Sequence, residues 1–598
     1  MEEIRENLKK EVKKLFDVEI EPEVVVAPEG QNADYASNVA MRVAGELHKH
    51  SFASSADVAP REIANMIAKE IEAMDLGFSV EVAGPGFLNF IARDEYWKTK
   101  LAEIEADFDK NISCDEYSGK TVICEFSDPN PFKVLHVGHL YTSIMGDSIS
   151  RLVEFAGGKV VRANFGGDVG LHVGKTLYAL TASASSASAD ARLAQRTKST
   201  SRSGAPASLN KLDAESTLTI ERIANAYVEG TRAYEDDENA KKEIVELNKE
   251  IYHIAENNIH DGELAELYWK GRETSYQYFE DFYKRVGVKF DKYYPESTVA
   301  KRGLSEVKEH TPEVYTESNG AVVFEGEKYD LHTRVFINAE GLPTYEAKDV
   351  GLIFTKWDDY KFDKSIVITG NDIIDYMKVV LKSISLYAPE LVERTKHITH
   401  GNVRLPGNEK MSSRKGNFIR AVDVLNSVEA LVARSASPAS SHNIATNTSQ
   451  IALGAIKYAF LRYKIGGNIE FDAKESVSTT GNSGVYLQYS AVRAKKILAG
   501  VKADEADFAK WELNENEKKL IKKLAQYGGV LKEAVSDFAP HKVANYLYET
   551  AQEFSRFYEN VKVAGSSQEA ERATLVETYY KVMEHGLNIL GIVIPEEM

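Results

Sequence analysis

The chain has 598 residues, enough for several domains with sizeable cores. Its 91 Asp and Glu residues outnumber its 73 Lys and Arg residues, which gives a formal net charge of −18. An acidic protein repels nucleic acid at long range, which counts against a general nucleic-acid coat, and any RNA must bind at a local basic patch.

Cysteine content and hydropathy exclude further classes of protein. The two cysteines, Cys114 and Cys124, are too few for a disulfide framework or a four-ligand zinc site. No apolar run in the sequence approaches the length that spans a membrane, and the stretch from Met1 to Ile4 does not resemble a signal peptide. We therefore expect a soluble, cytoplasmic protein.

Residues 1–110 predict a small α/β domain. An amphipathic helix is expected over residues 1 to about 20, with Ile4, Leu8 and Val12 on one side. A second helix is expected near 60–73, a strand over 78–82, and a turn over 83–90 that leads into another strand.

Residues 117–425 predict the main α/β domain. A β-branched run over 121–126 is followed by a turn at Pro129 and Pro131, a helix from His136 and a second strand over 159–165. Further strands are expected over 289–297, 321–324, 335–341 and 365–370, the first two of them in the returning half of the same sheet. This alternation predicts a doubly wound parallel (Rossmann-like) sheet, whose ligands lie at the carboxyl ends of its strands.

The remaining sequence is helical in pattern. A helical insertion is expected within the α/β domain, over about 180–285, and an all-α domain over 445–598 with helices near 450–463, 484–499, 515–535, 540–560 and 568–589. Two Ser/Ala-rich segments, 181–208 and 435–449, have few large apolar residues, and we assign them no role.

Two histidines flank a glycine where the helix is predicted to begin, as His136-Val-Gly138-His139. Free N–H groups and the dipole of a helix N-terminus attract phosphate oxygens. Histidines three residues apart share a helix face and can donate to the same phosphates, and Gly138 lets an adenine or its ribose approach the backbone. Taken alone, such a motif is more often surface or core packing than a nucleotide site.

A second motif lies far downstream, in the loop from Lys410 to Asn417. Lys410, Arg414 and Lys415 predict a mobile cationic clamp for a polyphosphate, although charges alone also fit an ordinary solvated loop. The two motifs together, in this order, resemble the paired signatures of class I aminoacyl-tRNA synthetases.

The resemblance narrows to the arginyl-tRNA synthetase family and covers nearly the whole chain. Segments similar to that family are Pro129-Asn130, Lys133, Gly146-Asp147, the stretch from Gly167 to Gly170, the stretch from Gly341 to Asp349, the stretch from Val485 to Arg493, and the final stretch from Leu590 to Met598. The resemblance implies that residues 1–110 contact the outer corner of tRNA and that residues 445–598 bind its anticodon arm.

The resemblance also implies a two-step reaction. The carboxylate of arginine attacks the α-phosphate of ATP, which carries Mg²⁺, and the arginyl-adenylate is then captured at the 3′ end of arginine tRNA. The implied enzyme has no structural metal and no membrane contact, and we expect a monomer. The implied ATP-binding residues are His136, Gly138, His139, Lys410, Met411, Ser412 and Ser413, with catalysis assigned to His136, His139, Lys133 and Lys410.

The arginine pocket needs carboxylates, because a guanidinium group has five donors in a planar fork. Glu125 and Asp349 are the acidic residues expected there, with Asn130, Tyr345 and Asn371 as further contacts implied by the resemblance. For tRNA, the expected residues are Tyr486, Tyr489 and Arg493, which share one stripe of a helix and combine stacking rings with a cation.

Some positions depart from the family pattern. Ser413 stands where the signature has its second lysine, Ile373 where many relatives have histidine, and His172 where they have glutamine.

Three alternative functions stay open at this point. Another class I synthetase such as the cysteinyl enzyme typically needs zinc-binding cysteines, a non-catalytic tRNA-binding paralogue should have lost one of the two motifs, and a small nucleotidyltransferase would not need the helical C-terminal third.

Overall fold

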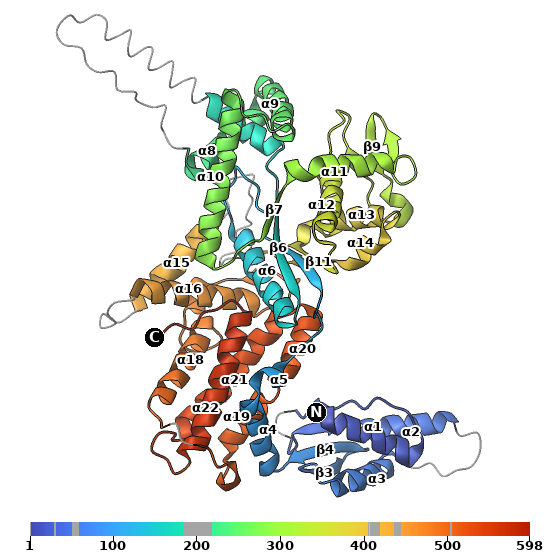
Figure 1. Cartoon of the computed structure of the whole chain (residues 1–598), viewed down its shortest axis with the longest axis vertical. Coiled ribbons are helices and arrows are strands. Elements are labelled where there is room, and N and C mark those ends of the chain that lie inside the picture. The colour runs from blue at the N-terminus through green and yellow to red at the C-terminus, as the bar shows by residue number, and fades with distance from the viewer. Residues whose placement is uncertain are drawn as a thin grey trace, which may run out of the picture. The chain divides into compact units, whose positions relative to one another are not determined.

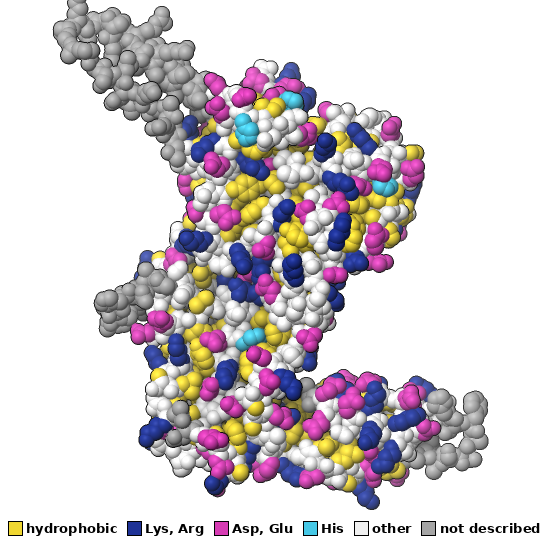
Figure 2. Space-filling view, in the orientation of Figure 1, with side chains coloured by type: hydrophobic (Ala, Val, Ile, Leu, Met, Phe, Trp, Pro, Cys, Tyr) yellow, Lys and Arg dark blue, Asp and Glu magenta, His cyan; other side chains and the backbone are white. Residues whose placement is uncertain are grey.

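The structure, a computed structural model, describes residues 2–28, 31–50, 59–182, 218–404, 406, 419–435, 444–502 and 505–598. The chain divides into two compact units (Figure 1). The first contains Met1–Ile112, Ala494–Gly528 and Thr550–Val582, and the second contains Ser113–Arg493, Gly529–Glu549 and Met583–Met598. Over the described residues in the view of Figure 2, acidic and basic side chains are interspersed.

The N-terminal part of the first unit is an α/β domain, as predicted. Its antiparallel sheet has the order β1 (Val25–Val26), β2 (Tyr35–Ser37), β4 (Phe87–Ala92), β3 (Phe78–Ala83). Its core includes Ile4, Leu8 and Val12, the apolar stripe predicted for the first helix. The helices are α1 (Glu2–Phe16), α2 (Val39–His50), α3 (Pro60–Ala73), α4 (Asp94–Ala106) and α5 (Phe108–Ile112).

A five-stranded parallel sheet organises the second unit. Its order is β12 (Thr395–His400), β11 (Lys364–Gly370), β5 (Thr121–Glu125), β6 (Lys159–Gly166), β7 (Lys292–Pro295). Helix α6 (Val137–Phe155) connects β5 to β6 and lies along the sheet (Figure 1). The strand order reverses between β5 and β11, and such a switch point is where open α/β sheets bind their ligands. The doubly wound sheet predicted from the sequence is thus confirmed.

Two predicted strands belong to another sheet. Strands β8 (Thr316–Ser318), β9 (Ala321–Phe324) and β10 (Arg334–Ile337) form a separate antiparallel sheet, so placing 321–324 in the returning half of the parallel sheet was wrong. The reason is local: Asn319 and Gly320 both have positive φ, at 51° and 80°, and join β8 to β9 as a two-residue hairpin turn.

Helices fill the rest of the chain. The helix predicted over 515–535 is two helices, broken at 525–526, and Gly528 and Gly529, which are poor helix formers, lie in the first turn of the second one. Residues 171–182 are helical, and a short strand pair is formed by β13 (Val403–Arg404) and β14 (Ile469–Glu470). The other elements are α8 (Ile220–Asp236), α9 (Glu238–Glu256), α10 (Glu263–Val286), α11 (Glu296–Glu309), η1 (Gly326–Tyr329), α12 (Tyr345–Tyr360), η2 (Asn371–Ile373), α13 (Ile374–Ser385), α14 (Pro389–Arg394), α15 (Ala421–Ser435), α16 (Ile444–Leu461), α17 (Ala473–Ser476), α18 (Gly484–Ala499), η4 (Phe508–Lys510), α19 (Glu515–Leu524), α20 (Tyr527–Asp537), α21 (Pro540–Asn560) and α22 (Glu569–Ile589). None of the helices in the described ranges is long and apolar enough to cross a bilayer.

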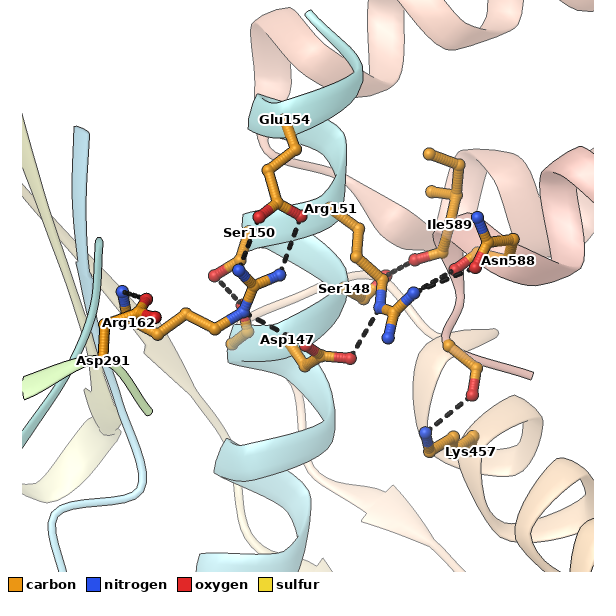
Figure 3. Close-up of polar contacts among 12 residues, drawn as sticks. Asp147, Ser148, Ser150, Arg151, Glu154, Arg162, Asp291, Lys457, Asn588 and Ile589 are labelled. Carbon is orange, nitrogen blue, oxygen red and sulfur yellow. Dashed lines mark hydrogen bonds and ion pairs between the residues drawn. The ribbon is translucent and has the colours of Figure 1, made fainter. Parts of the chain in front are cut away.

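Polar contacts hold the C-terminal half of α6 in place (Figure 3). Asp147 accepts from Arg151 Nε at 2.7 Å and from Arg162 Nε at 3.4 Å, and Arg162 also makes two hydrogen bonds to Glu154, at 2.6 and 2.8 Å. Ser148 Oγ donates to the carbonyl of Ile589 at 3.0 Å, and Arg151 Nη1 donates to Asn588 Oδ1 at 2.9 Å. The C-terminal end of α22 is therefore bound to the helix whose other end carries the histidine motif.

Candidate active site

A cavity of about 980 Å³ lies at the carboxyl ends of β5 and β11, beside the N-terminus of α6. It thus occupies the switch point of the parallel sheet, where the topology predicts a ligand. Its lining contains six of the residues expected from the sequence, namely Glu125, Asn130, His136, Gly138, His139 and Asp349, together with Asp128, Asp372, Tyr376 and His400.

The two histidines begin α6 and are held in a defined state. His136 is the N-cap: its Nδ1 accepts from Gly138 N at 3.1 Å, while His136 N donates to His139 Nδ1 at 3.1 Å. An imidazole whose Nδ1 accepts carries its proton on Nε2, so each ring has an Nε2–H donor. Burial lowers the pKa of His136 to about 4 and that of His139 well below its ordinary value. The pair is therefore neutral at pH 7 and offers hydrogen bonds to phosphate rather than positive charge.

Glu125, at the end of β5, has a cationic partner already. Lys356 Nζ donates to its Oε2 at 2.6 Å and to Ser365 Oγ at 3.1 Å, and the Glu125 and Lys356 side chains are both buried. A close, hydrogen-bonded partner compensates for removing a carboxylate from water. Glu125 consequently lines the cavity as a neutralised carboxylate.

Three further carboxylates line the cavity, and in the described part of the chain none of Asp128, Asp349 and Asp372 forms an ion pair. Asp128 Oδ1 accepts from Phe165 N at 2.8 Å, and the pKa of Asp128 is raised well above its ordinary value by burial and then by the nearby charge of Glu125. Burial also raises the pKa of Asp349 to about 7, although a hydrogen bond donated by the Tyr376 hydroxyl opposes the shift. Both groups would be stabilised in their ionised form by a cation in the cavity.

Asn130 and Lys133 follow on the same turn. Asn130 Oδ1 accepts from Gly167 N at 2.8 Å, which ties the turn to the end of β6. Lys133 Nζ lies 5.2 Å from the centre of the Tyr227 ring, and burial lowers its pKa. Lys133 is not among the described residues that line the cavity, but its charge acts on both histidines and helps to keep them neutral.

Two residues expected to bind arginine lie outside the cavity lining. Tyr345 is 56% exposed, and Lys348 Nζ lies 5.1 Å from its ring centre. Asn371 is exposed, and its Nδ2 donates to the carbonyl of Gly466 at 2.9 Å. Four other residues expected in the site, Lys410, Met411, Ser412 and Ser413, lie outside the described residues.

Three protein-family models together match almost the whole chain. The model for the catalytic domain of class I (R) tRNA synthetases matches residues 106–195 and 207–473. The arginyl tRNA synthetase N-terminal domain matches residues 2–92, and the DALR anticodon binding domain matches residues 487–598. The chain belongs to the arginyl-tRNA synthetase family.

Relatives in that family match over the same length. The arginine–tRNA ligase of Bacteroides fragilis (strain YCH46) is 26% identical over 556 residues, which cover 90% of this chain and 91% of that protein. Two solved arginyl-tRNA synthetases share the fold. The Thermus thermophilus structure is 22% identical with a TM-score of 0.74 and covers 100% of each chain. The Plasmodium falciparum structure is 18% identical with a TM-score of 0.76 and covers 100% of this chain and 99% of that one.

The expected tRNA residues lie on α18, within the second unit, near the start of the match to the family's anticodon-binding domain. Arg493 Nη2 donates to the Tyr489 hydroxyl at 3.0 Å, and its guanidinium carbon lies 4.6 Å from the centre of the Tyr489 ring. The Tyr486 ring lies 5.8 Å from that of Tyr548, in an edge-on arrangement. All three expected residues are partly buried, whereas their neighbour Gln488 is fully buried and donates to the carbonyl of Val593 at 2.7 Å.

Sequence reasoning missed three residues at this synthetase site. The sequence does contain a local sign that Asp128 belongs to the site, because it lies in the turn after the first strand of the parallel sheet, between Glu125 and Asn130. Lys356 and Tyr376 have none, since their contacts with Glu125 and Asp349 depend on how α12 and α13 pack. Among the described residues, no group of three or more His, Cys, Asp or Glu side chains could hold a metal ion.

Proposed function

We propose that this chain is an arginine–tRNA ligase. It joins arginine and ATP into arginyl-adenylate with release of pyrophosphate, and then transfers arginine to the 3′ end of arginine tRNA with release of AMP. One observation carries the proposal: one cavity is lined both by carboxylates that form no ion pair within the described residues and by a helix N-terminus with two histidine donors. Such a cavity matches a cationic amino acid beside a polyphosphate.

The carboxylates select the amino acid. Asp349, oriented by the Tyr376 hydroxyl, takes the guanidinium group, and Glu125 accepts from it through the oxygen that is not bonded to Lys356. Asn130 holds the α-amino or carboxylate end. A contact of arginine with Tyr345 or Asn371 requires those side chains to turn from their present neighbours toward the cavity.

The N-terminus of α6 receives the phosphates of ATP. The neutral rings of His136 and His139 donate through Nε2, the absence of a side chain at Gly138 leaves room for the nucleotide, and Lys133 supplies positive charge nearby. The loop residues Lys410, Met411, Ser412 and Ser413 complete the ATP site in this proposal. ATP enters with Mg²⁺ on its phosphates, and the Mg²⁺ neutralises charge as pyrophosphate leaves.

The chain positions the reactants rather than supplying a nucleophile. The carboxylate of arginine attacks the α-phosphorus of ATP, the bond to the β-phosphate oxygen breaks, and the 3′-terminal hydroxyl group of tRNA then attacks the mixed anhydride. In this proposal residues 1–110 contact the outer corner of tRNA, and Tyr486, Tyr489 and Arg493 contact its anticodon arm. The enzyme works in the cytoplasm as a monomer.

Exchange of pyrophosphate with ATP tests this proposal. The reaction should be measured with each of the twenty amino acids, with and without bulk tRNA. Exchange with arginine alone is the expected result, because only a guanidinium satisfies the buried carboxylates. Exchange with another amino acid would point to a different class I synthetase, and no exchange under either condition would favour a tRNA-binding paralogue.

A further inference from the structure

His400, the last residue of β12, lines the cavity and contacts α6. Thr142 Oγ1 lies 2.7 Å from His400 Nε2 and 2.9 Å from the carbonyl oxygen of Gly138. His400 Nδ1 lies 2.8 Å from the carbonyl oxygen of Gly401. The side chains of His400 and Thr142 are buried, so these contacts are sheltered from water. Three short distances thus connect the end of β12 to Gly138, the glycine of the histidine motif.

The protonation state of His400 decides how many of these contacts are hydrogen bonds. A carbonyl oxygen only accepts, so His400 Nδ1 carries a proton and donates to Gly401. In a neutral ring Nε2 has no proton, and the single hydroxyl proton of Thr142 goes either to Nε2 or to Gly138. In a protonated ring Nε2 donates to Thr142 Oγ1, and the hydroxyl donates to Gly138. Only the imidazolium form makes all three contacts hydrogen bonds at once.

The ligand-free cavity does not favour the charged ring. Burial lowers the pKa of His400, although the hydrogen bond to Gly401 and the charge of Asp372, on η2, oppose this shift. Tyr141 of α6 also contacts the imidazole, with its ring edge-on at 4.6 Å, and burial raises the pKa of Tyr141, so the phenol has no charge at pH 7. His400 is therefore neutral at pH 7 before a ligand binds.

ATP brings negative charge into the same cavity. Among the described residues that line it there are four carboxylates, and Arg404 is the one Lys or Arg side chain. His136 and His139 are neutral, so a polyphosphate at the N-terminus of α6 gains from a further positive charge nearby. A negative charge close to an imidazole favours its protonated form. The nucleotide and the proton on His400 should therefore stabilise each other.

We propose that His400 takes up a proton from solvent when ATP binds, and that the imidazolium stabilises the bound nucleotide. The proton enters at Nε2, which then donates to Thr142, and the hydroxyl proton of Thr142 turns to the carbonyl of Gly138. This inference rests on the proposed function and adds a residue that lies outside both sequence motifs. Because the pKa of His400 is higher in the complex than in the free chain, ATP affinity should fall as the pH rises between those two values, by at most about tenfold per pH unit.

Calorimetric titration of the full chain with MgATP tests this, at about pH 7 and in buffers of different ionisation enthalpy. The dependence of the heat on the buffer gives the number of protons taken up, which should approach about one per ATP. His400→Gln has an amide that does not titrate, and it should abolish the uptake and weaken MgATP by about tenfold while leaving arginine affinity unchanged.

His397→Gln is the matched control. His397 also lies on β12, with Nε2 2.7 Å from Thr369 Oγ1, but it is not among the described residues that line the cavity. This variant should change neither the proton uptake nor the affinity for MgATP. A loss of uptake in His397→Gln, with His400→Gln unaffected, would assign the proton to the wrong histidine and overturn the proposal.

Thr142→Val provides an independent variant if His400→Gln does not fold. It removes the hydroxyl that accepts from Nε2, so it should reduce both the proton uptake and the affinity for MgATP, and Thr142→Ser should restore both. Equal uptake in His400→Gln and the unmodified chain would overturn the proposal, as would binding of MgATP to the unmodified chain without proton uptake. Failure of the unmodified chain to bind MgATP would instead count against the proposed function itself.

Discussion

Lys356 Nζ lies 2.6 Å from Glu125 Oε2, and the two buried side chains come from positions 231 residues apart. The pair connects the end of β5 to α12, the helix that also carries Asp349. It places a cation against the carboxylate of Glu125, which lines the cavity. Among the described residues, the cavity is thus lined by one carboxylate with a cationic partner and by three, Asp128, Asp349 and Asp372, that form no ion pair.

Removing one partner of the Glu125–Lys356 pair should destabilise the folded chain. Lys356→Met leaves Glu125 as a buried carboxylate without its partner, and we expect a loss of about 3–5 kcal/mol in the free energy of unfolding, measured by urea denaturation. The double variant Glu125→Gln, Lys356→Met removes both charges and should recover much of that loss. A double variant no more stable than Lys356→Met would show that the ion pair is not the cause.

Asp349→Ala should raise the KM for arginine strongly while changing the KM for ATP little. The guanidinium would then lie in the cavity without its charged partner, which costs about 2–5 kcal/mol when the remaining charge stays desolvated. Pyrophosphate exchange at varied arginine and varied ATP gives both constants. An unchanged KM for arginine would remove Asp349 from the pocket.

Arginine binding should depend on pH through Asp349. Its pKa is raised to about 7 in the ligand-free chain, so the carboxylate that binds a guanidinium forms as the pH rises through neutrality. Between pH 6 and pH 8 the ionised fraction grows on the order of tenfold, and the Kd for arginine should fall by the same factor. Calorimetric titration at several pH values measures this.

Tyr376→Phe is the informative control for that pH profile. The Tyr376 hydroxyl donates to Asp349 and lowers its pKa, opposing the larger effect of burial. Removing the donor should move the midpoint of arginine binding to higher pH, and Asp349→Asn should shrink the pH-dependent change. A midpoint that stays in place in Tyr376→Phe would assign the titration to another group.

Local signals predicted the part of the site that is contiguous in the chain. The β5–α6–β6 unit follows from a β-branched run, a proline turn and a glycine stop, so the positions of Glu125, His136 and His139 follow with it. The Asn319-Gly320 hairpin signal was also present in the sequence, and reading it would have separated β9 from the parallel sheet.

Tertiary contacts account for what the sequence did not reveal. Thr344 is the N-cap of α12, but its hydroxyl donates to the carbonyls of Val335 and Phe336, at 2.7 and 3.0 Å, instead of accepting from the helix. The partners of Glu125 and Asp349 likewise come from helices whose packing has no local signature. Helix periodicity predicts which face is buried, not which polar atom it meets.

Lys410→Ala should slow adenylate formation far more than it weakens arginine binding. In the proposed reaction its charge acts mainly as pyrophosphate leaves, and an interaction made mainly in the transition state changes the rate rather than ground-state affinity. Single-turnover adenylate formation at saturating ATP and arginine measures this step. If Lys410→Ala forms the adenylate as fast as the unmodified chain, the charge that assists the departure of pyrophosphate comes from Lys133, Arg414 or Lys415 instead.

Variants of the expected tRNA residues on α18 can separate an effect on tRNA binding from an effect on folding. Tyr489 and Arg493 are partly buried and contact each other, with a 3.0 Å hydrogen bond and the guanidinium over the ring, so the pair presents a flat face with a cation beside it. A ring of this kind stacks on a base with about 1–3 kcal/mol, and arginine adds a phosphate contact.

We therefore expect Tyr489→Ala to raise the KM for tRNA while lowering the melting temperature little, because part of its ring faces solvent. Arg493→Ala should also reduce the salt dependence of tRNA binding, since one fewer phosphate is neutralised. Gln488→Ala is the matched control on the same helix: Gln488 is fully buried and bonded to Val593, so its loss should lower the melting temperature. Tyr489→Ala could instead lower the melting temperature strongly and leave the KM for tRNA unaltered in the folded fraction. That result would show that Tyr489 is a packing residue and that the anticodon arm binds at another face of the protein.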